Sequence, residues 1–309
     1  MKQSNSNRRR FLKDAVTAAA GMSLLPGLTE TVFASGRSEE NTVENVAPRQ
    51  WENPRIKFSV IGINHGHIYS QVEAVIRGGG QLVAVYAKEP DLLAAFTKRY
   101  PQAKVAQSEN EILQDQSIQL ILSSAIPVDR AGIGIRAMQH GKDYMVDKPG
   151  ITTLEQLEEV RRVQKQTGRI YSIMYSERFE NKATVKAGEL VKAGAIGNVI
   201  QTVIMAPHRI SLTTRPSWFF DKKNFGGILT DIGSHQFDQF LYFTGSDQAD
   251  IVASQVGNVA HPQYPAFEDF GDVMLRGNGG AGYIRIDWFT PDGLNTWGDG
   301  RLTVLGTQG

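Results

Sequence analysis

The sequence predicts an α/β protein of two domains, a doubly wound parallel sheet followed by an α+β domain with a large open, mainly antiparallel sheet. Three observations support this class. The chain has 309 residues, of which 41% are hydrophobic and 21% charged, so two globular cores are feasible. Strands alternate with amphipathic helices from 55 to 176, a pattern typical of right-handed crossovers. Residues 177–309 are richer in strands with alternating apolar side chains, as on a half-covered antiparallel sheet.

The elements of the first domain are predicted from apolar runs and helix-ending residues. Short apolar runs indicate buried parallel strands. Helices are expected where apolar residues recur at helical spacing, and glycine or proline ends each of them. The predicted strands are 56–63, 82–86, 104–106, 118–122, 144–146 and 170–174. The predicted helices are 67–77, 91–100, 129–140 and 153–167.

The second domain begins with helices and ends with strands. Helices are expected over 183–193 and 231–243, with strands over 198–205, 251–256, 272–275 and 283–288. The run Gly277-Asn-Gly-Gly280 predicts a tight hairpin between the last two strands. The chain ends soon after another strand-like run, 301–305, so we expect the C-terminal edge of this domain to be missing.

The N-terminus is typical of an export signal. Residues 1–34 contain five basic and two acidic side chains, then a weakly apolar run that ends at Ala34. The run is too short and too rich in small residues to span a bilayer stably. Arg8-Arg9-Arg10-Phe11-Leu12-Lys13 resembles the twin-arginine signal. We therefore predict a signal peptide over 1–34, a flexible linker over 35–54, and a periplasmic or otherwise exported protein that uses the twin-arginine export machinery.

Composition excludes several classes of function. The chain has no cysteine, so disulfides, zinc–thiolate sites, iron–sulfur clusters and a cysteine nucleophile are excluded. Its formal net charge of +1 argues against a nucleic-acid partner, because a chain that binds nucleic acid must neutralise many phosphates.

A glycine-containing turn follows the first predicted strand. In Gly62-Ile63-Asn64-His65-Gly66-His67, only the first glycine of the dinucleotide-binding fingerprint is kept. Such a turn places backbone N–H groups where a pyrophosphate binds, although an ordinary strand–helix turn has the same pattern. After the second strand, Lys88 stands near the place of the ribose-binding acid of NAD proteins. Lys88 favours NADP over NAD if it is not simply a solvated lysine.

Two further motifs carry ionisable residues. Asp147-Lys148-Pro149-Gly150 follows the fifth strand, where catalytic residues of doubly wound folds gather. Asp231 and His235 stand four residues apart after a glycine pair, on one face of a predicted helix, which suits proton transfer. A helix-terminal acid and a core histidine would give the same pattern. No third residue has convincing ligand spacing, so no metal site is expected.

Together these motifs resemble the Gfo/Idh/MocA family of glucose–fructose oxidoreductase and inositol dehydrogenase relatives. The stretches 141–149, 175–179 and 226–238 are similar to the family's motifs that contain E-K-P, Y-x-x-R-F and G-G-G-x-x-x-D-x-G-x-H-x-x-D. The resemblance covers 55–309 and implies a Rossmann domain, a nicotinamide cofactor, a sugar or polyol substrate and a homo-oligomer. It implies catalytic roles for Lys148, Asp231 and His235.

The expected reaction is hydride transfer between a substrate carbon and the nicotinamide. His235 would exchange the hydroxyl proton, Lys148 would bind the same oxygen, and Asp231 would orient the substrate and tune His235. The cofactor is NADP or NAD, with Gly62, Asn64, His65, Gly66, His67, Lys88, Pro127, Lys148 and Pro149 as its binding residues. Candidate substrate residues are Arg178, His208, Arg209, Arg215 and Trp218.

Export has a consequence for the reaction, because little free NAD(P)H is found outside the cytoplasm. We therefore expect a tightly held cofactor that is recycled within each turnover. An NAD-dependent glycosidase-type reaction by oxidation and elimination is the first alternative. A non-catalytic sugar-binding or scaffolding member of the fold is the second.

Overall fold

The first sheet is parallel and lies at the centre of the N-terminal domain. A computed structural model describes residues 53–309, so the predicted signal peptide and almost all of the linker lie outside the described residues. The strand order is β3-β2-β1-β4-β5-β6, and every neighbouring pair is parallel. The chain order reverses between β1 and β4, which makes their carboxyl ends the usual ligand site of this fold. The strands are β1 (Ile56–Ile61), β2 (Gly80–Tyr86), β3 (Lys104–Val105), β4 (Leu120–Ser123), β5 (Asp143–Asp147) and β6 (Tyr171–Met174).

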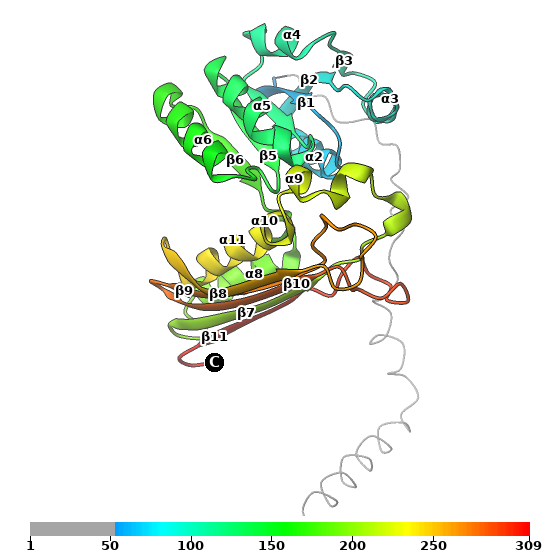
Figure 1. Cartoon of the computed structure of the whole chain (residues 1–309). Helices are drawn as coiled ribbons and strands as arrows, with labels where there is room; N and C mark the ends of the chain where they lie inside the picture. The colour runs from blue at the N-terminus through cyan, green and yellow to red at the C-terminus, as the bar shows by residue number, and fades with distance from the viewer. Residues whose placement is uncertain (1–52) are drawn as a thin grey trace, which may run out of the picture. The chain divides into compact units, whose positions relative to one another are not determined.

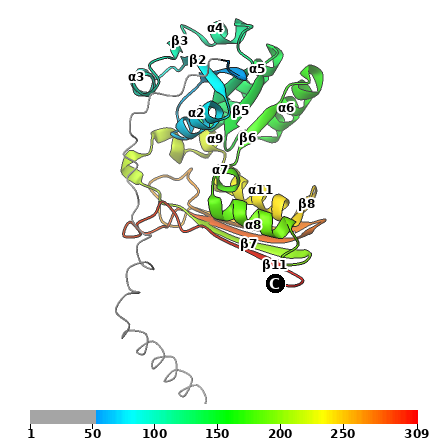
Figure 2. The same cartoon turned by 180° about the vertical axis from the view of Figure 1, so that it is seen from behind.

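Helices cover both faces of this sheet (Figures 1 and 2). On one face, Ile68 and Phe96 pack with Val60 of β1. On the other face, Ile133 packs with Ile61 of β1. The alternation of β1 side chains between two apolar layers explains its continuous hydrophobic run. The helices are α2 (His67–Arg77), α3 (Pro90–Arg99), α4 (Glu109–Gln114), α5 (Pro127–Gln139) and α6 (Leu154–Thr167).

The second sheet has the order β11-β7-β10-β9-β8. The β7–β10 pair is parallel and the other pairs are antiparallel. Phe240 packs against one face of it, in a buried cluster with Ile204, Val273 and Ile284. The strands are β7 (Val199–Pro207), β8 (Ala249–Gly257), β9 (Phe270–Gly277), β10 (Gly280–Asp287) and β11 (Arg301–Gly306). The helices before and beside it are α7 (Ser176–Phe179), α8 (Lys182–Lys192), α9 (Lys222–Phe225), α10 (Ile228–Asp231) and α11 (Gly233–Thr244), with short 3₁₀ turns at Leu212–Thr214 and Ser217–Phe220.

The fold class predicted from the sequence is confirmed, including the hairpin, whose pairing joins Gly277 to Gly280. One predicted helix was wrong in detail. The segment 231–243 is not one helix, because α10 ends at Asp231 and α11 begins at Gly233, and the amide of His235 donates to the carbonyl of Ile232. Gly233 allows α11 to lie close to β10, since a Cβ there would lie 2.9 Å from Ile286. Four short helices, α4, α7, α9 and α10, were not predicted.

No helix within residues 53–309 is both long enough and apolar enough to cross a bilayer.

Candidate active site

Lys148 and Asp231 form a buried ion pair that joins the two domains. Lys148 follows β5, Asp231 ends α10, and their Nζ and Oδ1 atoms are 3.0 Å apart. Their side chains are only 6% and 9% exposed. Each charge therefore depends on the other, because water cannot solvate either of them fully. The two motifs that carry the predicted catalytic residues meet at this pair.

Local structure positions both partners. Gly226 and Gly227 have φ angles of 90° and 93°, which lets the chain turn into α10. The amide of Ile228 then donates to Glu268 Oε2 at 2.9 Å, so a carboxylate anchors the start of α10. The Lys148–Pro149 peptide bond is cis.

Arg130 holds the segment that carries Lys148. This α5 side chain is 1% exposed and donates to the carbonyl oxygens of Asp147, Lys148 and Pro149. It also donates to Asp147 Oδ2 at 3.0 Å and to the carbonyl of Ala125 at 2.7 Å. One guanidinium therefore fixes three consecutive residues at the end of β5, and sequence reasoning missed it.

His235 lines the cavity that also contains the Lys148–Asp231 pair, and its imidazole ring is neutral. Burial and, to a smaller extent, the charge of Lys148 lower its pKa to about 4, against the opposing effect of Glu177. Its Nδ1 is buried without a hydrogen-bond partner, and its ring meets the edge of Tyr175 at 5.9 Å. Asp231, which the sequence analysis expects to tune His235, bonds Lys148 in the structure.

The folded protein should lose stability in acid through His235. Between about pH 6.5 and pH 4 the unfolded chain binds a proton there and the folded chain does not, so stability falls as pH falls. The expected loss is about 1 kcal/mol per pH unit over this window. Urea unfolding of His235→Gln at pH 7 and pH 5 should show a smaller loss than wild type. The exposed His140→Gln should behave as wild type, and equal losses in all three proteins would contradict the expectation.

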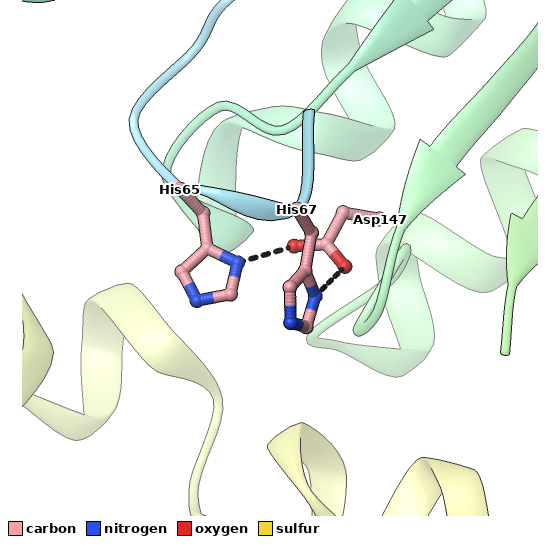
Figure 3. A group of neighbouring side chains, drawn as sticks. All are labelled: His65, His67 and Asp147. Carbon is pink, nitrogen blue, oxygen red and sulfur yellow. Dashed lines mark hydrogen bonds and ion pairs between the residues drawn. The ribbon is translucent and has the colours of Figure 1, made fainter. Parts of the chain in front are cut away.

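His65 and His67 share the carboxylate of Asp147 (Figure 3). Nδ1 of His65 lies 2.9 Å from Oδ2, and Nδ1 of His67 lies 2.9 Å from Oδ1. Although burial alone would raise it, the pKa of Asp147 is held well below its ordinary value by Arg130 and the two histidines. Burial lowers the pKa of His65 to about 4. Figure 3 shows the second ring nitrogen of each histidine turned away from Asp147.

This group also has the composition of a metal site. One candidate ligand atom from each of His65, His67 and Asp147 lies within 4.8 Å of the others. The sequence alone does not predict this group, because Asp147 lies far along the chain from the two histidines. In the structure Asp147 orients both imidazoles through hydrogen bonds, with Arg130 as its third donor.

The enclosing cavity has a volume of about 230 Å³. It lies at the carboxyl ends of β1 and β5 and reaches α10 and α11. Four of the chain's six histidines line it, together with three tryptophans. The polar and aromatic lining residues are His65, His67, Arg130, Lys148, Ser176, Glu177, His208, Arg215, Trp218, Phe219, Phe225, Asp231, His235, Trp288 and Trp297.

A second cavity, of about 680 Å³, opens at the carboxyl ends of β1, β2 and β4. Gly62, Asn64 and Lys88 line it, and Asn64 donates to Glu89 at 2.8 Å. Gly62 has φ +80°, and a Cβ there would lie 2.6 Å from Ala125, so only glycine lets these loops approach so closely. Gly66 begins α2 without a side-chain cap and has open space around it. These residues fit a dinucleotide, since its phosphates bind at such a helix start.

The predicted residues are not all at these cavities. His65, His67, Pro127 and Lys148 line the first cavity, as do the substrate candidates His208, Arg215 and Trp218. Two substrate candidates do not line it. Arg178 is bonded to both oxygens of Asp238, and Arg209 donates to the carbonyls of Pro291 and Leu294. Gly66 and Pro149 line neither cavity, although Pro149 is buried beside Lys148.

Glu177 is a cavity residue that the sequence analysis missed. It accepts from Gln236 Nε2 at 2.6 Å and lies 3.5 Å from His208 Nε2. Although burial alone would raise the pKa of Glu177, hydrogen bonding to His208 and the positive charge of Lys148 lower it. Its place within the Y-x-x-R-F-like segment was the only signal in the sequence.

A doubly wound domain with a dinucleotide groove, joined to a sheet domain by a lysine–aspartate pair, defines a class of nicotinamide-dependent oxidoreductases. The family model described as "Oxidoreductase family, NAD-binding Rossmann fold" matches residues 56–175, and "GFO/IDH/MocA C-terminal domain" matches 184–309. The chain belongs to the Gfo/Idh/MocA oxidoreductase family, whose cofactor is a nicotinamide dinucleotide.

Three relatives illustrate the similarity. A candidate oxidoreductase from Erwinia carotovora atroseptica SCRI1043 is 48% identical, with a TM-score of 0.80 and coverage of 82% of this chain and 76% of that one. The scyllo-inositol 2-dehydrogenase (NAD(+)) of Bacillus subtilis is 24% identical over 82% of this chain and 72% of its own length. The scyllo-inositol 2-dehydrogenase (NADP(+)) IolW of the same organism is 26% identical, over 48% of this chain and 41% of its own length.

Proposed function

We propose that this protein transfers hydride between a hydroxyl-bearing carbon of a sugar or polyol and NADP or NAD. The observation that carries this proposal is the buried Lys148–Asp231 pair beside a neutral His235, in a cavity that shares its loops with the dinucleotide groove. The two scyllo-inositol dehydrogenase relatives support a polyhydroxylated substrate. When bound, the nicotinamide supplies the hydride acceptor or donor.

The chain's own residues move the proton and stabilise charge. His235, neutral in the folded protein, accepts the proton of the substrate hydroxyl as the carbon is oxidised, and returns it in the reverse direction. Lys148 donates a hydrogen bond to the same oxygen and offsets its developing negative charge. Asp231 keeps the ammonium of Lys148 in place, and Arg130 fixes the backbone that carries it. The aromatic walls, Trp218 and Trp288 among them, exclude water from the reacting carbon.

The position of Lys88 bears on the choice of nucleotide. Lys88 is exposed at the end of β2 and lines the groove, where it can meet a 2′-phosphate. We expect Lys88→Ala to weaken NADP binding about 10-fold and NAD binding less than about 2-fold, because one charge-assisted contact at an exposed site is lost. Calorimetric titration of both nucleotides measures this. Lys98→Ala, an exposed lysine on α3, is the matched control. Equal losses of affinity for both nucleotides would contradict a preference for NADP.

Export by the twin-arginine route is part of the proposal. The support is the run Arg8-Arg9-Arg10-Phe11-Leu12-Lys13. Replacing Arg8 and Arg9 with lysine should retain the protein in the cytoplasm, as cell fractionation would show, and unchanged export would exclude this route. An exported enzyme should hold its cofactor tightly and recycle it. Nucleotide released on denaturing the purified protein would support this, whereas protein that is nucleotide-free and inactive with added NAD(P) would oppose it.

A homo-oligomer is also proposed. The face of the second sheet opposite to α11 includes Met274 and Leu305, which are 52% and 47% exposed, and no described element covers them. Apolar side chains on an uncovered sheet favour pairing with another copy. Light scattering after size exclusion should give a particle mass that is a multiple of the mass of one chain, which is 34.1 kDa for the full sequence. A monomer at all concentrations would exclude the proposal.

A further inference from the structure

Arg215 is a charged side chain of the cavity without an acidic partner. It lies between the two 3₁₀ turns and lines the cavity with Lys148 and His235. Its Nε donates to the carbonyl of Ile210 at 2.9 Å. Among residues 53–309 its terminal nitrogens have no hydrogen bond to a carboxylate and form no ion pair. An arginine head withdrawn from water in this way normally faces an anion.

Aromatic rings enclose the Arg215 guanidinium. Its central carbon lies 4.2 Å from the ring centre of Phe219, 5.0 Å from that of Trp288 and 5.2 Å from that of Trp297. Rings stabilise the cation through its flat faces and leave its edge, which carries the N–H fork, for a ligand. Burial lowers the pKa of Arg215, against the opposing effect of Asp231. The Nε1 of Trp288, a second donor in this wall, is buried without an acceptor.

The other charges around the cavity already have partners. Arg130 is paired with Asp147, and Lys148 with Asp231. Glu177 accepts from two glutamine side chains and lies beside His208. Arg215 is therefore the cation of this cavity that is left for a ligand.

We propose that the substrate carries a carboxylate and that Arg215 binds it, so that the enzyme acts on a sugar acid rather than a neutral sugar. This inference rests on the proposed function, because it takes the cavity as the substrate site. A planar carboxylate matches the fork of a guanidinium in two parallel hydrogen bonds. It also brings one negative charge to one unpaired positive charge. A phosphate group would bring a second charge, for which the described residues that line the cavity offer no second unpaired arginine or lysine.

Binding measurements test the proposal without requiring turnover. Three of the chain's four tryptophans line the cavity, so tryptophan fluorescence reports on its occupancy, and calorimetry provides an independent affinity. The probes are matched pairs: galacturonate with galactose, glucuronate with glucose, and gluconate with sorbitol. Glucose 6-phosphate is the phosphate arm. At least one acid should bind about 10- to 100-fold more tightly than its neutral partner, the range for a charge-assisted bidentate contact.

Variants identify the responsible residue. Arg215→Gln should remove this preference while changing the affinity for the neutral sugar less than about 3-fold, and Arg215→Lys should retain part of it. Arg276→Gln, an exposed arginine on β9, is the matched control. The Arg215→Lys variant serves if Arg215→Gln does not fold, as judged by thermal unfolding.

Several outcomes would overturn the proposal. It fails if no acid binds more tightly than its neutral partner, if glucose 6-phosphate is preferred to every carboxylate, or if Arg215→Gln weakens acid and neutral sugar equally. Failure of the proposed function would look different. In that case a sugar acid would bind through Arg215, but no hydride would pass between it and NADP or NAD.

Discussion

Replacing Lys148 with methionine is expected to lower the turnover of hydride transfer by about 10²- to 10⁴-fold. The ammonium is the cation placed to offset charge on the substrate oxygen, and it is bonded to Asp231 at 3.0 Å. Methionine has a similar length and no charge, so cavity shape changes little. Stopped-flow measurement of nicotinamide absorbance, with nucleotide affinity measured separately, would show whether the loss lies in the chemical step.

The same substitution leaves Asp231 buried without its partner, so stability must be separated from chemistry. Lys148→Met/Asp231→Asn removes both charges and should recover much of the lost stability but none of the lost turnover. Lys165→Met, at an exposed position on α6, is the control for the substitution itself. Turnover within about 3-fold of wild type in a folded Lys148→Met protein would remove Lys148 from the catalytic group.

The largest loss of stability is expected from Arg130→Met. The substitution leaves the Asp147 charge without its guanidinium and removes hydrogen bonds to four carbonyl groups. Breaking a buried pair in this way costs about 3–5 kcal/mol, which corresponds to a fall in Tm of roughly 10 °C in a domain of this size. Differential scanning calorimetry measures it.

Arg136→Met is the matched control on the same helix. Arg136 pairs with Glu109, but its side chain is 48% exposed, so its loss should cost less than about 1 kcal/mol. The double variant Arg130→Met/Asp147→Asn should be more stable than Arg130→Met, because it removes the orphaned charge. If Arg130→Met and Arg136→Met lower Tm equally, Arg130 does not hold the segment of Lys148.

The Asp147–Arg130 pair also sets a pH window. Because the pKa of Asp147 is depressed in the folded protein, its stabilising contribution is present above the unfolded value of about 3.9 and is lost below it. The acid loss at His235 begins at a higher pH, near 6.5. The two groups therefore contribute to acid unfolding in separate ranges.

Local patterns in the sequence were enough to predict the fold class. Buried strands and helix-ending glycines are local signals. Lys148 follows β5 directly, so the alternation of strands and helices along the chain places it at the carboxyl edge of the parallel sheet. The grouping of Lys148 with Asp231 and His235 came from a family resemblance, because their separation along the chain contains no local signal. The interruption between α10 and α11 and the close approach of Gly233 to β10 have no signal in the hydrophobic periodicity.

The charge partners within the site could not be read from spacing. Asp231 and His235 are four residues apart on the chain, yet Asp231 bonds Lys148 of the first domain. Asp147 is bonded to His65 and His67 from the turn into α2 and to Arg130 from α5, so only the folded chain shows that its carboxylate is fully bonded. Arg178 and Arg209 were plausible ligands by residue type, but nearby acceptors hold both.

The most direct test is single-turnover hydride transfer in the purified protein with its nucleotide bound. A panel of sugars, polyols and sugar acids is mixed with the protein, and nicotinamide absorbance is followed with substrate that carries hydrogen or deuterium at the reacting carbon. We expect at least one compound to reduce the bound nucleotide, more slowly with deuterium, and no reduction with Lys148→Met. A folded, nucleotide-loaded protein that shows no redox change with any member of the panel would contradict hydride transfer at this cavity.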